Sequence, residues 1–157
     1  RALGDEIERA VFFERDAAGR LHLRQGLGPE VAQSAGQSAP LFPGGAAQRV
    51  LEGGETVRVD EAYFDALPEG LPWAGWLRRM RSGVYVPVMH DGHAHGMLAL
   101  FDSRPGAYED EDVHFAESVA HVLSAALQRE QAERRLSHMA QFDALTGLPN
   151  RTLLEDR

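Results

Sequence analysis

The stretch GVYVPVMHDGHAHGMLALFDS, residues 83–103, carries the clearest structural signal in the sequence. Two alternating runs flank the dipeptide Asp91-Gly92, and both residues of that dipeptide tolerate the positive φ that a tight β-hairpin turn needs. We therefore expect an antiparallel hairpin at the centre of a sheet. Pro87 has no N–H group to donate, so we also expect a bulge or a locally unpaired edge near it.

A second hairpin is predicted upstream, from AVFFER (10–15), the turn DAAG (16–19) and RLHLRQ (20–25). Between the two hairpins, the pattern predicts a short helix over 29–34 and a loop over 36–43. An amphipathic helix near 46–51 follows and ends at Gly53-Gly54, and a short strand covers 56–59. The region 60–80 has no clean period, and we expect it to lie over another part of the domain.

A long helix is predicted from Glu109 to Ala140. Its acidic first residues suit the positive end of a helix dipole, and no Gly or Pro interrupts it. One apolar face should pack on the upstream domain; it contains Val113, Ala116, Val119, Ala120, Leu123 and Leu127.

A second apolar stripe on this helix has heptad-like spacing, with Arg129 at its one polar position. Its members are Val122, Ala125, Ala132, Leu136 and Met139. We interpret the stripe as the seam of a parallel two-stranded coiled coil, which predicts a homodimer. The alternative is a single solvated helix whose few apolar residues contact their own domain.

Composition excludes several classes of function. The chain has 157 residues, a net charge of -8 and no cysteine. The acidic balance argues against nucleic acid as a partner, because no basic surplus is present to neutralise phosphates. The lack of cysteine excludes disulfides and thiolate chemistry and agrees with a cytoplasmic location. No apolar run reaches the roughly twenty residues that a membrane-spanning helix needs, so none is expected.

The aromatic and basic residues around 60–85 form a candidate ligand pocket, in which aromatic rings would stack on a flat ligand and arginine would bind an anion. Its members are Tyr63, Phe64, Trp73, Trp76, Arg81 and Tyr85. The alternative is that these side chains fill the core beneath the long loop.

The histidines offer a less favoured site. His90, His93 and His95 cluster at the hairpin turn, and His114 and His121 lie two helical turns apart. A turn is usually exposed and offers no supporting groups, so we assign no metal site. A haem or metal sensor stays an alternative, and the sequence implies no cofactor. No nucleophile and base stand in a recognisable pattern, so we expect no catalysis by this chain.

Residues 84–127 resemble the end of a GAF domain, in which a VPV…DG…GML.L hairpin leads through an acidic EDE turn into a closing helix. The segment VLEGGETVRVD (50–60) is similar to the helix-Gly-strand passage of that family. The resemblance covers residues 1–128. It implies an α+β fold, with an antiparallel sheet flanked by helices, a ligand pocket between sheet and loops, and a long C-terminal signalling helix. GAF methionine sulfoxide reductases and bilin photoreceptors rely on cysteine, so neither activity is implied here, and the NKxxF-type pattern of cyclic-nucleotide GAF domains is not found.

The segment DALTGLPNR, residues 143–151, resembles the DxLTGLxNR motif that opens GGDEF domains, the diguanylate cyclases that make cyclic di-GMP from GTP. The matching residues are Asp143, Leu145, Thr146, Gly147, Leu148, Asn150 and Arg151. We therefore interpret 129–141 as a coiled-coil-like helical linker and 142–157 as the truncated start of a GGDEF domain. The GG(D/E)EF loop itself is not in the sequence, so this chain is not a cyclase by itself.

Together these patterns predict a bacterial, cytoplasmic sensory module. A GAF domain would bind a small molecule or a partner, and its dimeric helix would control a diguanylate cyclase. A ligand-free GAF domain that serves only as a dimerisation scaffold is the main alternative.

Overall fold

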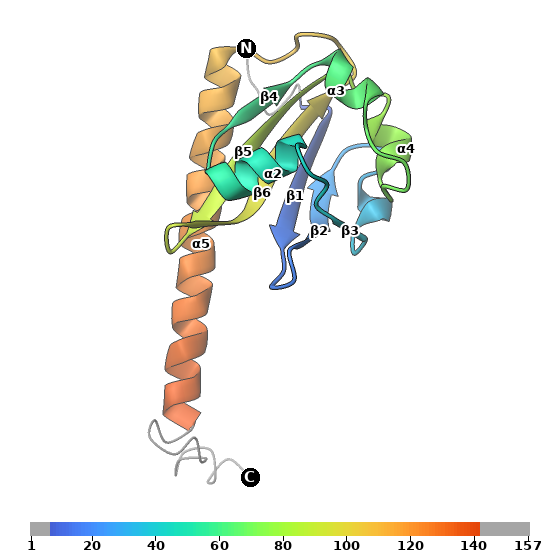
Figure 1. The fold of residues 1–157 in the computed structure, drawn as a ribbon. Helices are drawn as coiled ribbons and strands as arrows, with labels where there is room; N and C mark the ends of the chain where they lie inside the picture. Colours follow the sequence, from blue (N-terminus) through green and yellow to red (C-terminus); the bar gives the residue numbers. More distant parts are fainter. Residues whose placement is uncertain (1–6, 142–157) are drawn as a thin grey trace. The chain divides into compact units, whose positions relative to one another are not determined.

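The computed structural model describes residues 7–141, which form a six-stranded antiparallel sheet and its flanking helices (Figure 1). The strand order is β3-β2-β1-β6-β5-β4. In chain order the elements are β1 (Arg9–Arg15), β2 (Arg20–Leu27), the 3-10 helix η1 (Ala32–Ser34), β3 (Ser38–Pro40), α2 (Ala46–Gly53), β4 (Val57–Val59), α3 (Glu61–Asp65), α4 (Ala74–Leu77), β5 (Ser82–His90), β6 (His93–Asp102) and α5 (Asp110–Gln141). The predicted α+β class is confirmed.

Both predicted hairpins are present. β5 and β6 turn at Asp91 and Gly92, whose φ angles are 51° and 79°, so the dipeptide supplies the left-handed conformation that the turn needs. β1 pairs with both β2 and β6 and joins the two hairpins into one sheet. The β5–β6 hairpin therefore lies next to β1 in the middle of the sheet, as expected.

Pro87 behaves as the sequence suggested. It pairs with Met97 on β6, and the register shifts immediately afterwards, between Val88 and Met89. On the other side of β5, the pairing with β4 ends at Tyr85. Pro87 thus lies beyond the end of β4, where its missing N–H group costs no hydrogen bond to that neighbour.

Two segments differ from the prediction. The expected loop over 36–43 contains the strand β3, because Ser38–Pro40 pairs with β2 over three residues. The expected helix over 29–34 is reduced to η1. The region 60–80 contains the short helices α3 and α4, of which α3 is capped by the Asp60 carboxylate. β3 depends on pairing with a distant strand and α3 on a local cap, and a periodicity search detects neither.

Helices α2, α3 and α4 cover one face of the sheet (Figure 1). Phe101 is at the centre of this core, with ring centroids 5.4–6.0 Å from those of Tyr85, Trp76 and Phe64. α2 presents Ala46, Ala47, Val50 and Leu51 to the sheet and ends at Gly54, whose φ is 67°. The aromatic residues of region 60–80 thus lie over the sheet, as expected.

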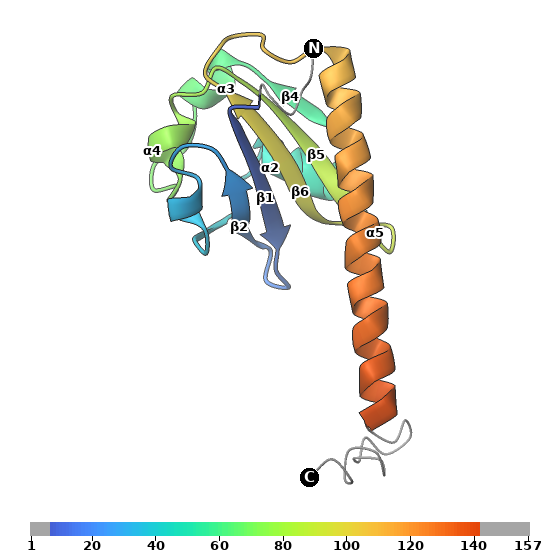
Figure 2. The same cartoon turned by 180° about the vertical axis from the view of Figure 1, so that it is seen from behind.

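The first part of α5 lies on the opposite side of the sheet from these helices, beside β5 and β6 and not over β1 and β2 (Figure 2). Ala116 and Ala120 are buried there, and the strand residues of this face, including Val84, Val86 and Leu100, are buried as well. Residues up to Val122 belong to one compact unit, and the remainder of α5 belongs to a second.

Within residues 7–141, no helix combines the length and the apolar character needed to cross a bilayer.

Candidate functional site

An open hollow with a volume of about 490 Å³ lies along β4, an edge strand of the sheet. The start of α2, the start of α3 and the start of β5 complete its walls. A hollow of this size suits a small-molecule ligand. It is lined by Gly44, Ala46, Arg49, Arg58, Val59, Asp60, Tyr63, Arg81, Ser82, Gly83, Gly106 and Tyr108.

Three arginines from separate elements line this hollow. Arg58, on β4, bonds Asp110 at 2.8 Å and donates to the carbonyl oxygen of Tyr108. Arg81 bonds Asp65 at 2.9 Å. Arg49, on α2, is exposed, and its side chain has no hydrogen-bond or ion-pair partner within residues 7–141. The hollow therefore has a guanidinium donor on each of three elements.

Tyr63 separates the hollow from the interior. Its hydroxyl lies 2.9 Å from the hydroxyl of Tyr85, which is buried. Burial raises the pKa of Tyr85 well above its usual value, and it raises the pKa of Tyr63 as well, although the hydrogen bond between the two hydroxyls opposes the shift at Tyr63. Both phenols are therefore neutral, and their hydroxyl groups form a hydrogen-bonded polar pair between the hollow and the interior.

The structure divides the six predicted pocket residues between two places. Tyr63 and Arg81 border the open hollow. Tyr63, Trp73 and Tyr85 border an interior gap of about 20 Å³, which is room for roughly one water molecule. Phe64 and Trp76 are core residues, and the Trp76 indole N–H donates to the Ser34 hydroxyl at 3.0 Å. The predicted set thus lies together, but only two of its members border a space of ligand size.

Sequence reasoning missed Arg49 and Arg58 as site residues. They belong to α2 and β4, and only the pairing of β4 with β5 brings them near Arg81. The alternation of Arg58 with the inward-facing Val57 and Val59 was a usable signal, because it directs the arginine away from the core.

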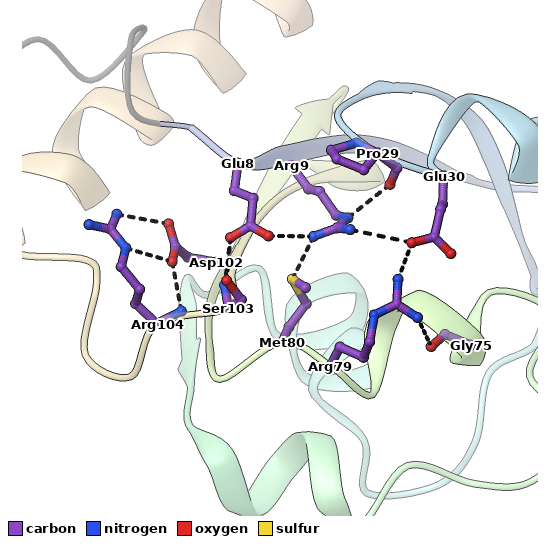
Figure 3. A network of polar contacts seen from close by, with 10 residues as sticks. All are labelled: Glu8, Arg9, Pro29, Glu30, Gly75, Arg79, Met80, Asp102, Ser103 and Arg104. Atoms are coloured by element: carbon purple, nitrogen blue, oxygen red, sulfur yellow. Dashed lines mark hydrogen bonds and ion pairs between the residues drawn. The ribbon is translucent and has the colours of Figure 1, made fainter.

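A separate polar network ties the start of β1 to the loops beside it (Figure 3). The guanidinium of Arg9, 4% exposed as a residue, donates to the Pro29 carbonyl at 2.9 Å and to the Glu8 carboxylate at 2.7 Å. It also lies 5.8 Å from the centre of the Trp76 ring. Arg79 contacts Glu30 at the outer side of this network. The partners of Arg9 are all supplied by the chain, so we assign the network a structural role.

The histidines are distributed rather than gathered around one point. His95 lies 2.8 Å from the Glu14 carboxylate, and the His90 and His95 rings are 6.2 Å apart. His114 and His121 are exposed on α5. No group of three potential ligands among His, Asp and Glu is placed to hold a metal ion in the described part of the chain.

The family model of the GAF domain matches residues 1–128. The chain belongs to the GAF domain family. The GAF domain matched there includes all residues of the β4 hollow. No curated protein sequence matches the chain significantly.

Several solved structures share this fold. The GAF domain of the Acinetobacter phosphoenolpyruvate-protein phosphotransferase is 20% identical, with a TM-score of 0.65, over 83% of this chain and 77% of that one. The GAF-B domain of DevS from Mycobacterium smegmatis is 16% identical, with a TM-score of 0.64, over 83% and 86%. The type II free methionine-R-sulfoxide reductase from Thermoplasma acidophilum is 17% identical, with a TM-score of 0.62, over 81% and 84%. At these identities the likeness concerns the fold alone.

Proposed function

We propose that this GAF domain is the sensory input of a diguanylate cyclase, and that α5 carries its signal to the catalytic domain. The observation that carries the proposal is the continuity of α5, which runs without a break from the buried Ala116 to Gln141. The motif DALTGLPNR begins two residues later, at Asp143, outside the described residues. Its resemblance to the start of a GGDEF domain supports the assignment of the output.

A parallel dimer through α5 is part of this proposal. Val122, Leu136 and Met139 are 68%, 67% and 59% exposed, which is unusual for large apolar side chains and supports a partner helix. Phe115 is 47% exposed and precedes Val122 by one heptad, so the apolar stripe begins earlier than the sequence pattern alone suggested. The partner we propose is a second copy of this chain, because two GTP-loaded cyclase domains must meet to join two nucleotides.

The test is an assay of the parent protein with GTP, in which cyclic di-GMP is identified by mass spectrometry. We expect product from the wild type and at least a roughly tenfold loss in Leu136→Asp, since a charge in the seam separates the helices. Ser137→Asp, an exposed neighbour outside the seam, is the control. A folded parent that makes no cyclic di-GMP would contradict the proposal.

A ligand-free dimerisation scaffold is the second candidate, and the tight interior favours it. The gap beside Trp73 has a volume of only about 20 Å³, and Phe13 and Trp73 pack with ring centroids 5.3 Å apart. Native mass spectrometry of the purified chain separates the candidates. A co-purifying small molecule supports the sensor, whereas a clean dimer of apo mass supports the scaffold.

Methionine sulfoxide reduction is not proposed. Two structural neighbours are free methionine-R-sulfoxide reductases, but this chain has no cysteine, the residue that carries the chemistry in enzymes of that kind.

A further inference from the structure

The lining of the hollow beside β4 contains more basic than acidic side chains, although the chain as a whole is acidic. The chain contains 24 acidic and 16 basic residues, yet the lining of the hollow contains Arg49, Arg58 and Arg81 against the single carboxylate of Asp60. That carboxylate accepts a hydrogen bond from the Ala62 backbone N–H at 3.2 Å and caps α3. Arg58 and Arg81 are paired with Asp110 and Asp65, so the guanidinium of Arg49, which has no side-chain partner within residues 7–141, is the charge that favours a negatively charged occupant.

The donors in this hollow are only partly used. A guanidinium has several N–H groups in a planar fork, and Arg81 uses one of its terminal nitrogens on Asp65. Arg49 uses none within residues 7–141. The remaining donors can take carboxylate or phosphate oxygens in pairs.

The start of α2 supplies a second kind of donor. Gly45 caps this helix without a side-chain hydrogen bond, and Ala46, the first helical residue, lines the hollow. Free N–H groups at the first turn of a helix favour an anion. The start of α2 therefore borders the same space as the three arginines.

We propose that this hollow binds a compact organic or phosphorylated anion, recognised through its carboxylate or phosphate groups by Arg49, Arg81 and the start of α2. The proposal deepens the proposed sensory role and rests on it. It also suggests how binding reaches α5. Arg58 lines the hollow and bonds Asp110, the first residue of α5, so an anion that draws on Arg58 competes with that ion pair.

Titration calorimetry of the 157-residue chain tests this site, with inorganic phosphate, succinate and the neutral analogue succinamide as probes. We expect phosphate or succinate to bind and succinamide not to bind. Arg49→Gln and Arg81→Gln should each weaken binding by about tenfold, the value of one charge-assisted hydrogen bond. Arg78→Gln, an exposed arginine that bonds the Pro68 carbonyl instead, should bind as the wild type does.

Two results of this titration would contradict the anion site. Binding of neither anion at about 10 mM, or equal affinity in both hollow variants and the wild type, would overturn the proposal. Circular dichroism melting checks that each variant is folded. Because the measurement needs no cyclase activity, this site and the proposed control of a cyclase can fail separately.

Discussion

Arg9 illustrates how a buried charge is accommodated in this core. Its side chain is 5% exposed, and its partners Glu8 and Glu30 are 29% and 45% exposed, so the carboxylates keep contact with water while the guanidinium does not. The Met80 sulfur, at 3.4 Å, and the Trp76 ring take up the remaining space around it. The charge is therefore fully surrounded by acceptors and by an aromatic face, which offsets its desolvation.

Replacing Arg9 by alanine should destabilise the domain. The substitution leaves a cavity beside Trp76 and removes the hydrogen bond to Pro29, so we expect a loss of about 3 kcal/mol in the free energy of unfolding. Urea denaturation followed by tryptophan fluorescence measures it. Arg9→Met keeps most of the volume and should cost less than Arg9→Ala. Equal stability of wild type and Arg9→Ala would show that the network does not contribute.

The carboxyl group of Glu14 makes the stability of the fold depend on pH in the acidic range. Burial raises the pKa of this carboxyl, but hydrogen bonds from His95 and Arg24 outweigh that effect and lower the pKa below its ordinary value of 4.5. A carboxylate with a lowered pKa in the folded state stabilises the protein above its unfolded pKa, and this contribution is lost as the pH falls through the folded value.

We therefore expect Glu14→Gln to be less stable than the wild type at about pH 6, and the difference to shrink below about pH 4. Urea denaturation at a series of pH values measures this. Glu52→Gln, which removes an exposed carboxylate on α2, is the control and should show no such convergence. A difference that stays constant with pH would assign the effect of Glu14 to packing.

Sequence analysis identified the aromatic residues of the core correctly as a group but could not tell a filled core from a vacant pocket. Aromatic residues such as Tyr63, Trp73 and Tyr85 can line either a filled core or a vacant pocket. The two cases differ in the volume left between the side chains, which is about 20 Å³ here. That volume depends on Phe13 and Met97, from distant strands, which also line the gap. That Arg81 lies outside the core was predictable from its charge, and the structure places it at the border of the open hollow.

At the scale of elements, the two hairpins and α5 were predictable because their signals are local: a turn dipeptide, alternation and a helical period. β3 was not, since Ser38–Pro40 becomes a strand only by pairing with β2. α3 could have been found from Asp60, an N-cap residue ahead of Glu61. α4 carries no comparable signal in its four residues, because no side chain caps it.

The contact between β1 and β6 depends on a glycine, Gly96 on β6. A Cβ atom at Gly96 would lie 2.2 Å from the Phe13 carbonyl oxygen, which is backbone and cannot rotate away. Gly96→Ala should therefore push the two strands apart and cost about 2–3 kcal/mol of unfolding free energy. Gly75→Ala is the matched control, because its Cβ would meet nothing within 4 Å in α4. We expect that control to be neutral or slightly stabilising by thermal melting, and similar losses in both variants would contradict the steric argument.

The apolar stripe of α5 leads to a prediction about the proposed dimer. Arg129 occupies the polar position of the heptad pattern between Val122 and Leu136, where two copies would bring like charges together. Arg129→Leu should tighten the dimer by about tenfold or more, while Leu136→Asp should produce monomers. Sedimentation velocity over a range of concentrations measures both. Equal dissociation constants for wild type, Arg129→Leu and Leu136→Asp would exclude this stripe as the interface.

At the scale of the whole molecule, a sensor and an output joined by one helix can communicate in two ways. If the connection is a flexible tether, the activity of the output depends mainly on the length of the tether. If it is a paired helix, the activity depends on the register of the apolar stripe. The described part of α5 contains neither Gly nor Pro, which favours a helix that keeps its register. The residues 129–135, REQAERR, make up one heptad of the proposed seam and give a means to separate the two cases.

Duplicating residues 129–135 in the parent protein adds one heptad and keeps Leu136 and Met139 on the face that contains Val122. Duplicating residues 134–135 alone adds less length but rotates the later positions by about 200° around the helix. We expect the longer duplication to retain cyclic di-GMP synthesis and its response to ligand, and the shorter one to lose the response. The assay is product formation from GTP, with dimer content checked by sedimentation. If activity instead falls with inserted length regardless of register, α5 acts as a tether, and the paired-helix mechanism is wrong.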